Sequence, residues 1–342
     1  MNFNNSKINI YSLPKNELIN ALTMHKFSSF YIKSLIKQIF LGNIGDFKQL
    51  NFDNYKINIL NDNFILNSSK IIKVLKDKNT TKFLIELYDK NVIEAVVLNY
   101  DHGNTLCVST QVGCNMGCKF CASGINKKIR NLEVNEIIEQ FILIKNDQKI
   151  KIKNIVFMGI GEPLDNYDNL TKSLKIFIDM LLIGPKHITV STCGIMNKLQ
   201  DFKNNFPNIS IALSLHSCFD DIRSKLMPIN NAYNLDQIIT WIKTNYPKKS
   251  SKKLTIEYTL IENINDRDED IEKIITLLKE TNVLINVISY NKVINSEHQP
   301  SRKIDTFVKK LISNGFKVTT RLSLGNDINA ACGQLRINYG KV

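Results

Sequence analysis

The sequence predicts an α/β protein built as a partial (β/α)6 barrel with a small N-terminal α+β accessory domain. Three observations support this fold class. Strand-like and helix-like segments alternate from about residue 104 onward, the residues before that point lack this alternation, and 342 residues can bury one large core plus a smaller appendage. We therefore expect an accessory domain over 1–95 and a barrel over 96–342.

The accessory domain is expected to begin with helices and end with strands. Residues 1 to about 68 have helical and loop character, and 30–40 (FYIKSLIKQIF) place apolar residues at near-helical spacing with basic residues between them. Short strands are then predicted over 70–77, 82–88 and 91–99, separated by the turn-prone stretches DKNTT and DKN.

Six strand–helix units follow, which implies parallel strands joined by right-handed crossovers. Six units are too few for a complete eightfold barrel and suit an open one. In such folds the chemistry gathers in loops at the carboxyl ends of the strands. The predicted units are 106–111 with 133–146, 154–158 with 167–181, 187–191 with 196–203, 209–214 with 235–246, 254–260 with 270–280, and 284–290 with 304–314, before a last strand over 317–323.

The composition favours a polyanionic partner. The chain has 45 Lys and Arg against 32 Asp and Glu, a net charge of +13, which points to RNA or DNA ahead of a membrane surface. The alternative explanation is the general Lys, Asn and Ile bias of the chain. No apolar run approaches the roughly 20 residues needed to span a bilayer, and the N-terminus lacks the apolar core of a signal peptide. We expect a cytoplasmic protein that binds no membrane.

Four of the seven cysteines fall within residues 107–121, and three of these form the motif VGCNMGCKFCASG. This C-x3-C-x2-C spacing suits an iron–sulfur cluster held by Cys114, Cys118 and Cys121, because three thiolates on four irons leave one iron open. The alternative is a zinc site. It would need His102 or Cys107 as a fourth ligand at irregular spacing, and structural zinc commonly uses paired C-x2-C units, of which no second pair exists.

The cysteine spacing, with Phe120 before the third cysteine, resembles the radical S-adenosylmethionine (SAM) superfamily. Further motifs resemble the RlmN/Cfr family of RNA adenine methyltransferases from residue 104 to the end of the chain. Ile160 and Cys193 depart from that family's usual Met and Ser. The motifs are MGIGEPLDN (158–166), VSTCGI (190–195), LSLHS (213–217), RSKLMPIN (223–230) and DINAACGQL (327–335).

The resemblance implies a [4Fe–4S] cluster and SAM as cofactors. Glu162 can accept a hydrogen bond from the SAM ammonium group, and Asn291, at a strand end, can bond adenine or ribose edges. Ser191 and His216 also end predicted strands, so they should converge on the same rim. The positions that the resemblance assigns to SAM are Gly161, Glu162, Ser191, Ser214, Leu215, His216 and Asn291.

The resemblance also assigns catalytic roles to Cys332, Cys107 and Glu94. Cys332 would accept a methyl group from one SAM, and a radical made from a second SAM would activate that methyl group for addition to adenine. Cys107 would then attack the sulfur of Cys332, releasing the product and leaving a disulfide. Glu94 matches the position of a general base. Cys193 and Cys218 are expected to be structural.

The implied substrate is C2 of an adenine in 23S rRNA, with the adenine 3′ of the tRNA anticodon as a further target in some members. An electron donor of the flavodoxin or ferredoxin type and a monomeric state are also expected. One alternative is Cfr-type methylation of C8. The length and residue pattern of the C-terminal stretch RLSLGNDINAACGQLRINYGK favour it, while GEP at 161–163 and STCGI favour C2. Alternatives of other classes are a radical SAM activase that modifies a protein and an RNA-binding module with a structural metal.

Overall fold

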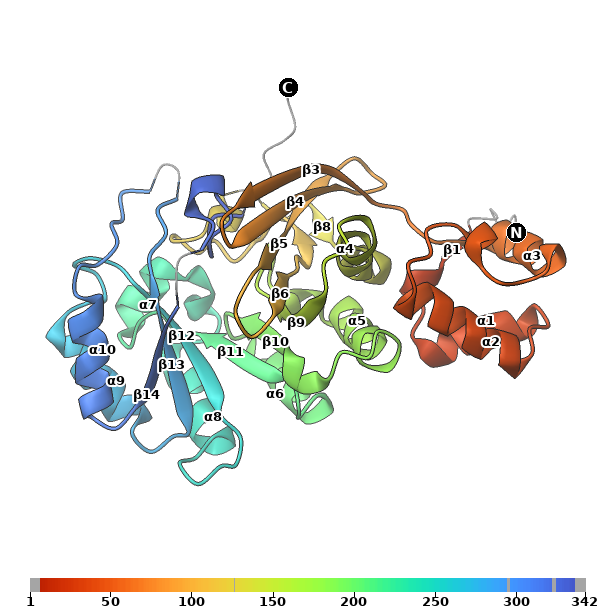
Figure 1. Cartoon of the computed structure of the whole chain (residues 1–342). Coiled ribbons are helices and arrows are strands. Elements are labelled where there is room, and N and C mark those ends of the chain that lie inside the picture. The colour runs from red at the N-terminus through yellow and green to blue at the C-terminus, as the bar shows by residue number, and fades with distance from the viewer. Residues whose placement is uncertain (1–6, 126, 294–295, 322–323, 336–342) are drawn as a thin grey trace.

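The structure is a computed structural model that describes residues 7–125, 127–293, 296–321 and 324–335. Its centre is a ten-stranded sheet with the strand order β14-β13-β12-β11-β10-β9-β6-β5-β4-β3 (Figure 1). The sheet is open, because β14 and β3 lie at its two edges. The predicted fold class is confirmed.

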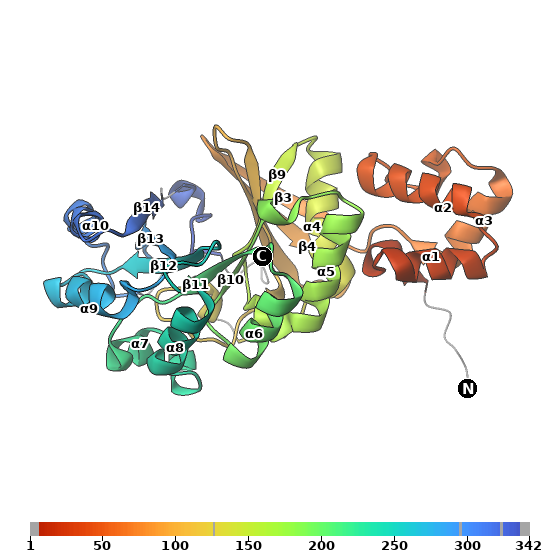
Figure 2. The same ribbon diagram turned by 90° about the horizontal axis from the view of Figure 1, so that it is seen from below.

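Seven strands of this sheet run parallel, and helices connect them in sequence. The helices lie on the outer side of the sheet (Figure 2). The strands are β6 (Asn104–Cys107), β9 (Ile152–Phe157), β10 (Ile188–Thr192), β11 (Ser210–Ser214), β12 (Leu254–Leu260), β13 (Val283–Ser289) and β14 (Lys317–Arg321). The helices between them are α4 (Val134–Asp147), α5 (Tyr167–Asp179), α6 (Met196–Asn205), α7 (Asp220–Leu226) with α8 (Leu235–Asn245), α9 (Asp268–Leu278) and α10 (Ile304–Ser313).

All six predicted strand–helix units are therefore present, with small differences at their ends. The predicted strand 106–111 is divided into β6 and β7 (Gln111–Val112), and β7 pairs with β8 (Arg130–Asn131) in a separate two-stranded sheet. Residues 322–323 of the predicted last strand lie outside the described residues. The helix α7 was not predicted.

Three antiparallel strands extend the barrel sheet on the side of β6. They are β3 (Lys70–Asp77), β4 (Thr80–Glu86) and β5 (Val92–Leu98), close to the predicted ranges. β5 pairs with β6, so the sheet continues across the expected domain boundary. A division at residue 95 falls inside β5 instead of in a linker.

The first helices form a lobe beside the barrel (Figures 1 and 2). They are α1 (Lys15–Met24), α2 (Ser29–Ile36), which continues into the π-helical turn η2 (Lys37–Leu41), and α3 (Asn54–Asn63). The short strands β1 (Ile8–Asn9) and β2 (Phe64–Ile65) pair next to them. Each helix buries one apolar face, such as Ile32 and Leu35 of α2, and this packing is the main source of stability for helices so short.

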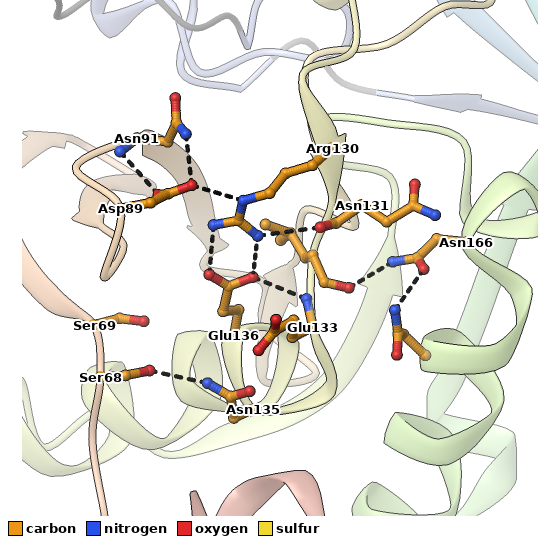
Figure 3. A network of polar contacts seen from close by, with 12 residues as sticks. Ser68, Ser69, Asp89, Asn91, Arg130, Asn131, Glu133, Asn135, Glu136 and Asn166 are labelled. Atoms are coloured by element: carbon orange, nitrogen blue, oxygen red, sulfur yellow. Dashed lines mark hydrogen bonds and ion pairs between the residues drawn. The ribbon is translucent and has the colours of Figure 1, made fainter. Parts of the chain in front are cut away.

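Polar contacts fix the front part of the chain to α4. The carboxylate of Glu139 accepts hydrogen bonds from the backbone N–H groups of Ser68 and Ser69 at 3.0 and 2.9 Å and from Asn9 Nδ2 at 2.6 Å. Figure 3 shows a second network, in which Arg130 binds both carboxylate oxygens of Glu136, at 2.6 and 2.7 Å, and also Asp89 in the turn between β4 and β5, at 2.7 Å. Bidentate pairs of this kind are geometrically specific.

Among the described residues, no helix is both long and apolar enough to cross a membrane.

Candidate active site

A cavity opens at the carboxyl ends of the parallel strands, where the barrel prediction placed the chemistry. It holds about 920 Å³ of empty space, part of which is open to solvent. Its wall includes Cys114, Cys118 and Cys121, so the structure brings all three predicted cluster ligands to one space.

The cluster loop runs from β7 to the turn η4 (Ala122–Gly124) and needs glycine to curl as it does. Gly113 and Gly117 have φ of +82° and +67°, a region that disfavours other residues. A side chain on Gly113 would also place a Cβ 2.4 Å from the carbonyl oxygen of Lys127. These constraints explain why glycines flank the first two cysteines.

Three thiols that face one cavity fit a [4Fe–4S] cluster with one open iron, in which each cysteine binds its own iron. Burial raises the pKa of Cys114 to about 12, so the thiol must lose its proton as the cluster binds. Neither His102 nor Cys107, the suggested fourth ligands of a zinc site, lines this cavity. Within the described chain, no three His, Cys, Asp or Glu side chains are grouped tightly enough to ligate a single metal ion.

Glu162 is fixed in the cavity wall directly after β9. Its two carboxylate oxygens accept hydrogen bonds from the backbone N–H groups of Leu164, at 3.0 Å, and Cys193, at 2.9 Å. Gly161, at φ +104°, lies so close to Gln111 that an added Cβ would be 2.6 Å from that side chain. The carboxylate therefore has a fixed position from which it can accept a hydrogen bond from an ammonium group.

His216 presents a neutral donor to the cavity. Its Nδ1 accepts a hydrogen bond from the backbone N–H of Thr259 at 2.9 Å. Burial, with the nearby charge of Arg223, lowers the pKa of His216 to about 3, so the ring is neutral and its proton is on Nε2. The Phe120 ring lies 4.5 Å from the imidazole, centroid to centroid, and joins His216 to the cluster loop.

The remaining predicted SAM residues divide into two groups. Ser191, Ser214 and Asn291 line the cavity. Leu215 does not: its side chain is buried in the main hydrophobic core, and its backbone N–H donates to the carbonyl oxygen of Glu257. Successive side chains leave a strand on opposite sides, which accounts for the separation of Ser214 and Leu215.

Arg223, from the RSKLMPIN motif, holds the strand ends that carry these groups. It is fully buried, and its guanidinium donates to the carbonyl oxygens of Cys193, Ser214 and Leu215 at 3.0 to 3.2 Å. The arginine thereby fixes the backbone at the ends of β10 and β11. Sequence reasoning recognised the motif without assigning a role to this residue.

Cys332 lies where two cavities meet. It lines the main cavity and also a smaller one, which Cys107 lines too. Burial raises the pKa of Cys107 to about 12. Cys332 is exposed, and desolvation by the surrounding chain raises its pKa as well; the charge of Arg321 opposes both shifts. The structure thus brings together the two thiols that the sequence placed more than 200 residues apart.

Arg321 is a residue of this site that sequence reasoning missed. It ends β14, lines both cavities, and is the one charged side chain among the described residues around the smaller cavity. Its hydrogen bond within the described structure goes to the weak acceptor Met158 Sδ, at 3.3 Å. A guanidinium with N–H groups to spare can serve thiolates or a ligand. The available signal was a single arginine within the predicted last strand, 317–323, which no motif marked.

Glu94, predicted as a general base, lines neither cavity. Its carboxylate lies 3.1 Å from the ammonium group of Lys82, and both side chains are buried. Of the two cysteines expected to be structural, Cys218 belongs to the main hydrophobic core, whereas Cys193 lines the main cavity.

Comparisons with known proteins identify the family of this chain. The model of the Radical SAM superfamily matches residues 108–278. The probable dual-specificity RNA methyltransferase RlmN of Clostridium botulinum is 41% identical over 97% of this chain and 98% of its own length. The same-named protein of Clostridium beijerinckii is 43% identical over 84% of this chain and 85% of its own.

A solved structure extends the agreement to three dimensions. The radical SAM methyltransferase from Sphaerobacter thermophilus superposes with a TM-score of 0.91 and 29% identity, covering 96% of this chain and 99% of that one. The chain belongs to the RlmN family of radical SAM RNA methyltransferases, enzymes that use a [4Fe–4S] cluster and SAM.

Proposed function

We propose that this enzyme methylates C2 of an adenine in 23S rRNA, by way of S-methylcysteine at Cys332 and with two molecules of SAM. The observation that carries the proposal is the position of Cys332. Cys332 lines the cavity that the three cluster cysteines line, and it also lines the smaller cavity that Cys107 lines. A methyl carrier must meet SAM first and the resolving thiol afterwards.

The first step is a displacement by Cys332. The thiolate attacks the methyl carbon of SAM, the bond from that carbon to the SAM sulfur breaks, and its electron pair stays on sulfur, giving S-adenosylhomocysteine. Glu162 and His216 are placed to orient SAM for this attack, the first as an acceptor and the second as an Nε2–H donor.

When bound, the cluster supplies the electron that cleaves a second SAM, and the resulting radical removes a hydrogen atom from the methyl group on Cys332. This detour suits adenine C2, an electrophilic carbon that cannot take a methyl cation by ordinary displacement. The methylene radical on Cys332 would add to C2, and the adduct then loses one electron, which the oxidised cluster would accept, and the C2 proton, which a base removes. Cys107 next attacks the sulfur of Cys332: the S–S bond forms, the C–S bond breaks with its electron pair moving onto the carbon, and that carbon takes a proton to become the methyl group. A two-electron reductant must then restore both thiols.

The C2 position is favoured by GEP at 161–163 and by the STCGI stretch, and C8 is the alternative. The dual-specificity name of the relatives favours tRNA as a second substrate. We also infer that the protein is a cytoplasmic monomer, takes electrons from a flavodoxin- or ferredoxin-like donor, and binds RNA through the accessory domain over 1–95.

Mass spectrometry of adenosines tests the substrate and the position. Digested 23S rRNA and tRNA from cells with and without the gene should differ in 2-methyladenosine. A difference in 8-methyladenosine instead would establish C8 methylation, and no difference in any adenosine would contradict the proposal.

Two single substitutions test the order of the thiols. Cys332→Ala should retain the cluster and yield no methylated RNA, because no methyl carrier can form. Cys107→Ala should still load the methyl group and then stall with RNA bound covalently through Cys332, visible as a protein band that shifts after nuclease treatment. An adduct trapped by Cys332→Ala but not by Cys107→Ala would reverse the two roles.

A further inference from the structure

We infer that Lys82 is a positioning residue for Cys332: a buried cation that fixes the backbone of the segment that carries this thiol. The inference rests on the proposed role of Cys332 as the methyl carrier. It concerns strands β3–β5, which supply none of the residues proposed to hold the cluster or SAM.

Lys82 lies on β4 and reaches out of the sheet to the C-terminal segment. Its Nζ donates to the backbone carbonyl oxygen of Asn329 at 3.1 Å and lies 3.1 Å from Glu94 Oε1 on the adjacent strand β5. The two side chains are only 3% and 2% exposed. The contact with Asn329 joins residues 247 positions apart in sequence.

The carbonyl that Lys82 holds belongs to the turn that leads into Cys332. Asn329 has φ of +50°, a left-handed conformation that asparagine tolerates better than most residues. On the far side of the thiol, the N–H of Ala122 donates to the carbonyl oxygen of Gly333 at 2.6 Å, and Asn291 Nδ2 donates to that of Cys332 at 3.0 Å. Hydrogen bonds therefore hold the backbone on both sides of Cys332, from Lys82 on β4 before it and from Ala122 in the turn after the cluster loop behind it.

A buried lysine is costly unless a counter-charge accompanies it. Glu94 supplies that charge, and the carbonyl oxygen of Asn329 accepts from another of the three N–H groups of the ammonium. Because Glu94 lines neither cavity, its position suits this role better than direct contact with a substrate base. A displacement of about 1 Å at a reacting group can cost about 100-fold in rate, so an anchor three residues from the thiol can matter greatly.

The test is the rate at which Cys332 takes up methyl from SAM in the full-length, cluster-loaded enzyme without RNA. Lys82→Met combined with Glu94→Gln removes both charges and leaves no unpaired buried ion. Glu94→Gln alone removes the counter-charge and leaves Lys82 buried, so it measures how far the anchor depends on that charge. Lys90→Met is the matched control, because Lys90 pairs with Glu86 at the same 3.1 Å but is 78% exposed.

With isotopically labelled SAM, site-resolved mass spectrometry should show methyl uptake slowed about 10- to 100-fold in the double variant. Lys90→Met should stay within about threefold of wild type, since it keeps the Lys82 anchor. Iron content and reductive cleavage of SAM should be unchanged throughout, and amide hydrogen exchange should rise only around 326–335. A general loss of folding would instead lower iron content and SAM cleavage together.

Normal methyl uptake by the double variant would overturn the inference, and so would equal slowing by Lys90→Met. Should the double variant fail to fold, Lys82→Gln with Glu94→Gln replaces it, because a side chain one bond shorter than lysine weakens the contact with Asn329 and leaves no buried ion. If wild-type Cys332 takes up no methyl at all, the proposed function fails. The inference on Lys82 then depends on hydrogen exchange, and unchanged protection of 326–335 would refute it.

Discussion

One arginine, Arg321, acts on two thiols outside the cluster loop. In the proposed mechanism Cys107 and Cys332 act as thiolates, yet desolvation raises the pKa of both, and the positive charge of Arg321 opposes this shift in each case. Thiolates rather than thiols are nucleophilic, so the position of Arg321 links the sheet edge at β14 to the reaction.

We predict that Arg321→Gln makes Cys332 less reactive. Removing the positive charge raises the thiol pKa further, and below that pKa each unit lowers the thiolate fraction tenfold. Alkylation of Cys332 by iodoacetamide at pH 8, followed by mass spectrometry, should slow by about tenfold. Arg302→Gln is the control, because Arg302 is 93% exposed and pairs with Glu262 at 3.8 Å. Equal rates of Cys332 alkylation in Arg321→Gln and Arg302→Gln would show that Arg321 does not lower the pKa of this thiol.

His216 predicts a dependence of stability on pH. Its pKa falls from about 6.5 in the unfolded chain to about 3 in the folded one, so only the unfolded chain takes up a proton between these values. The stability from neutral His216 is therefore complete above pH 6.5 and is lost as the pH falls towards 3. His216→Asn tolerates the φ of +55° and retains an acceptor for Thr259. Its melting temperature should fall less than that of wild type between pH 7 and pH 5.

Sequence reasoning found the site residues that sit in motifs and missed those that act from a distance. Cys114, Glu162 and Ser191 are in the predicted cavity wall because strand ends of a parallel sheet share one edge. Arg321 and Lys82 carry no motif, and their partners are remote in sequence, so only the fold reveals them. Leu215 was predicted by resemblance, yet its side chain turns into the core.

At the level of elements, the alternation of strand-like and helix-like segments predicted the barrel well, because the local residue pattern of each segment identifies it as a strand or a helix. The pairing of β5 with β6 depends on the whole fold and has no local signature. That is why the three antiparallel strands were assigned to a separate domain, although they extend the barrel sheet. The contact of Lys82 on β4 with Asn329 gives this extension a consequence for the site.

Glu139 of α4 should control how firmly the front segment docks. Its carboxylate accepts from the backbone of Ser68 and Ser69 and from Asn9, and Glu139→Ala would leave these donors without an acceptor. A cost of about 2–4 kcal/mol is expected, visible as a lower melting temperature and faster hydrogen exchange at residues 68–69. Glu17→Ala, which removes an exposed partner 4.0 Å from Lys172 between α1 and α5, should change neither quantity.

At the scale of the whole molecule, the lobe of α1–α3 carries basic side chains that suit contact with RNA. The lobe of α1–α3 projects from the barrel, and the exposed Phe30, Lys33 and Lys37 recur on α2 and its continuation at the spacing of one helix face. Phe30 is 74% exposed, so a face of its ring is open to contact with a base. Lysines beside an exposed aromatic ring suit contact with phosphates and an unstacked base.

RNA affinity should therefore fall steeply with salt, and Lys33→Ala with Lys37→Ala should make the dependence shallower. Each phosphate contact releases counterions and adds about 0.7 to 0.9 to the slope of log affinity against log salt, so the loss of two contacts should lower the slope by about 1.4 to 1.8. Phe30→Ala should weaken binding at every salt concentration without changing the slope, because stacking releases no counterions.

The matched control is Lys248→Ala with Lys249→Ala, which removes the same charge from the exposed turn before β12, at the end of the barrel opposite the cavity. Titration of a fluorescent adenine-containing stem–loop from 50 to 300 mM salt measures all four slopes, and SAM cleavage without RNA shows that the barrel is intact. A slope that falls equally in the control pair would mean that RNA responds to net charge alone, and the lobe would then have no specific part in binding.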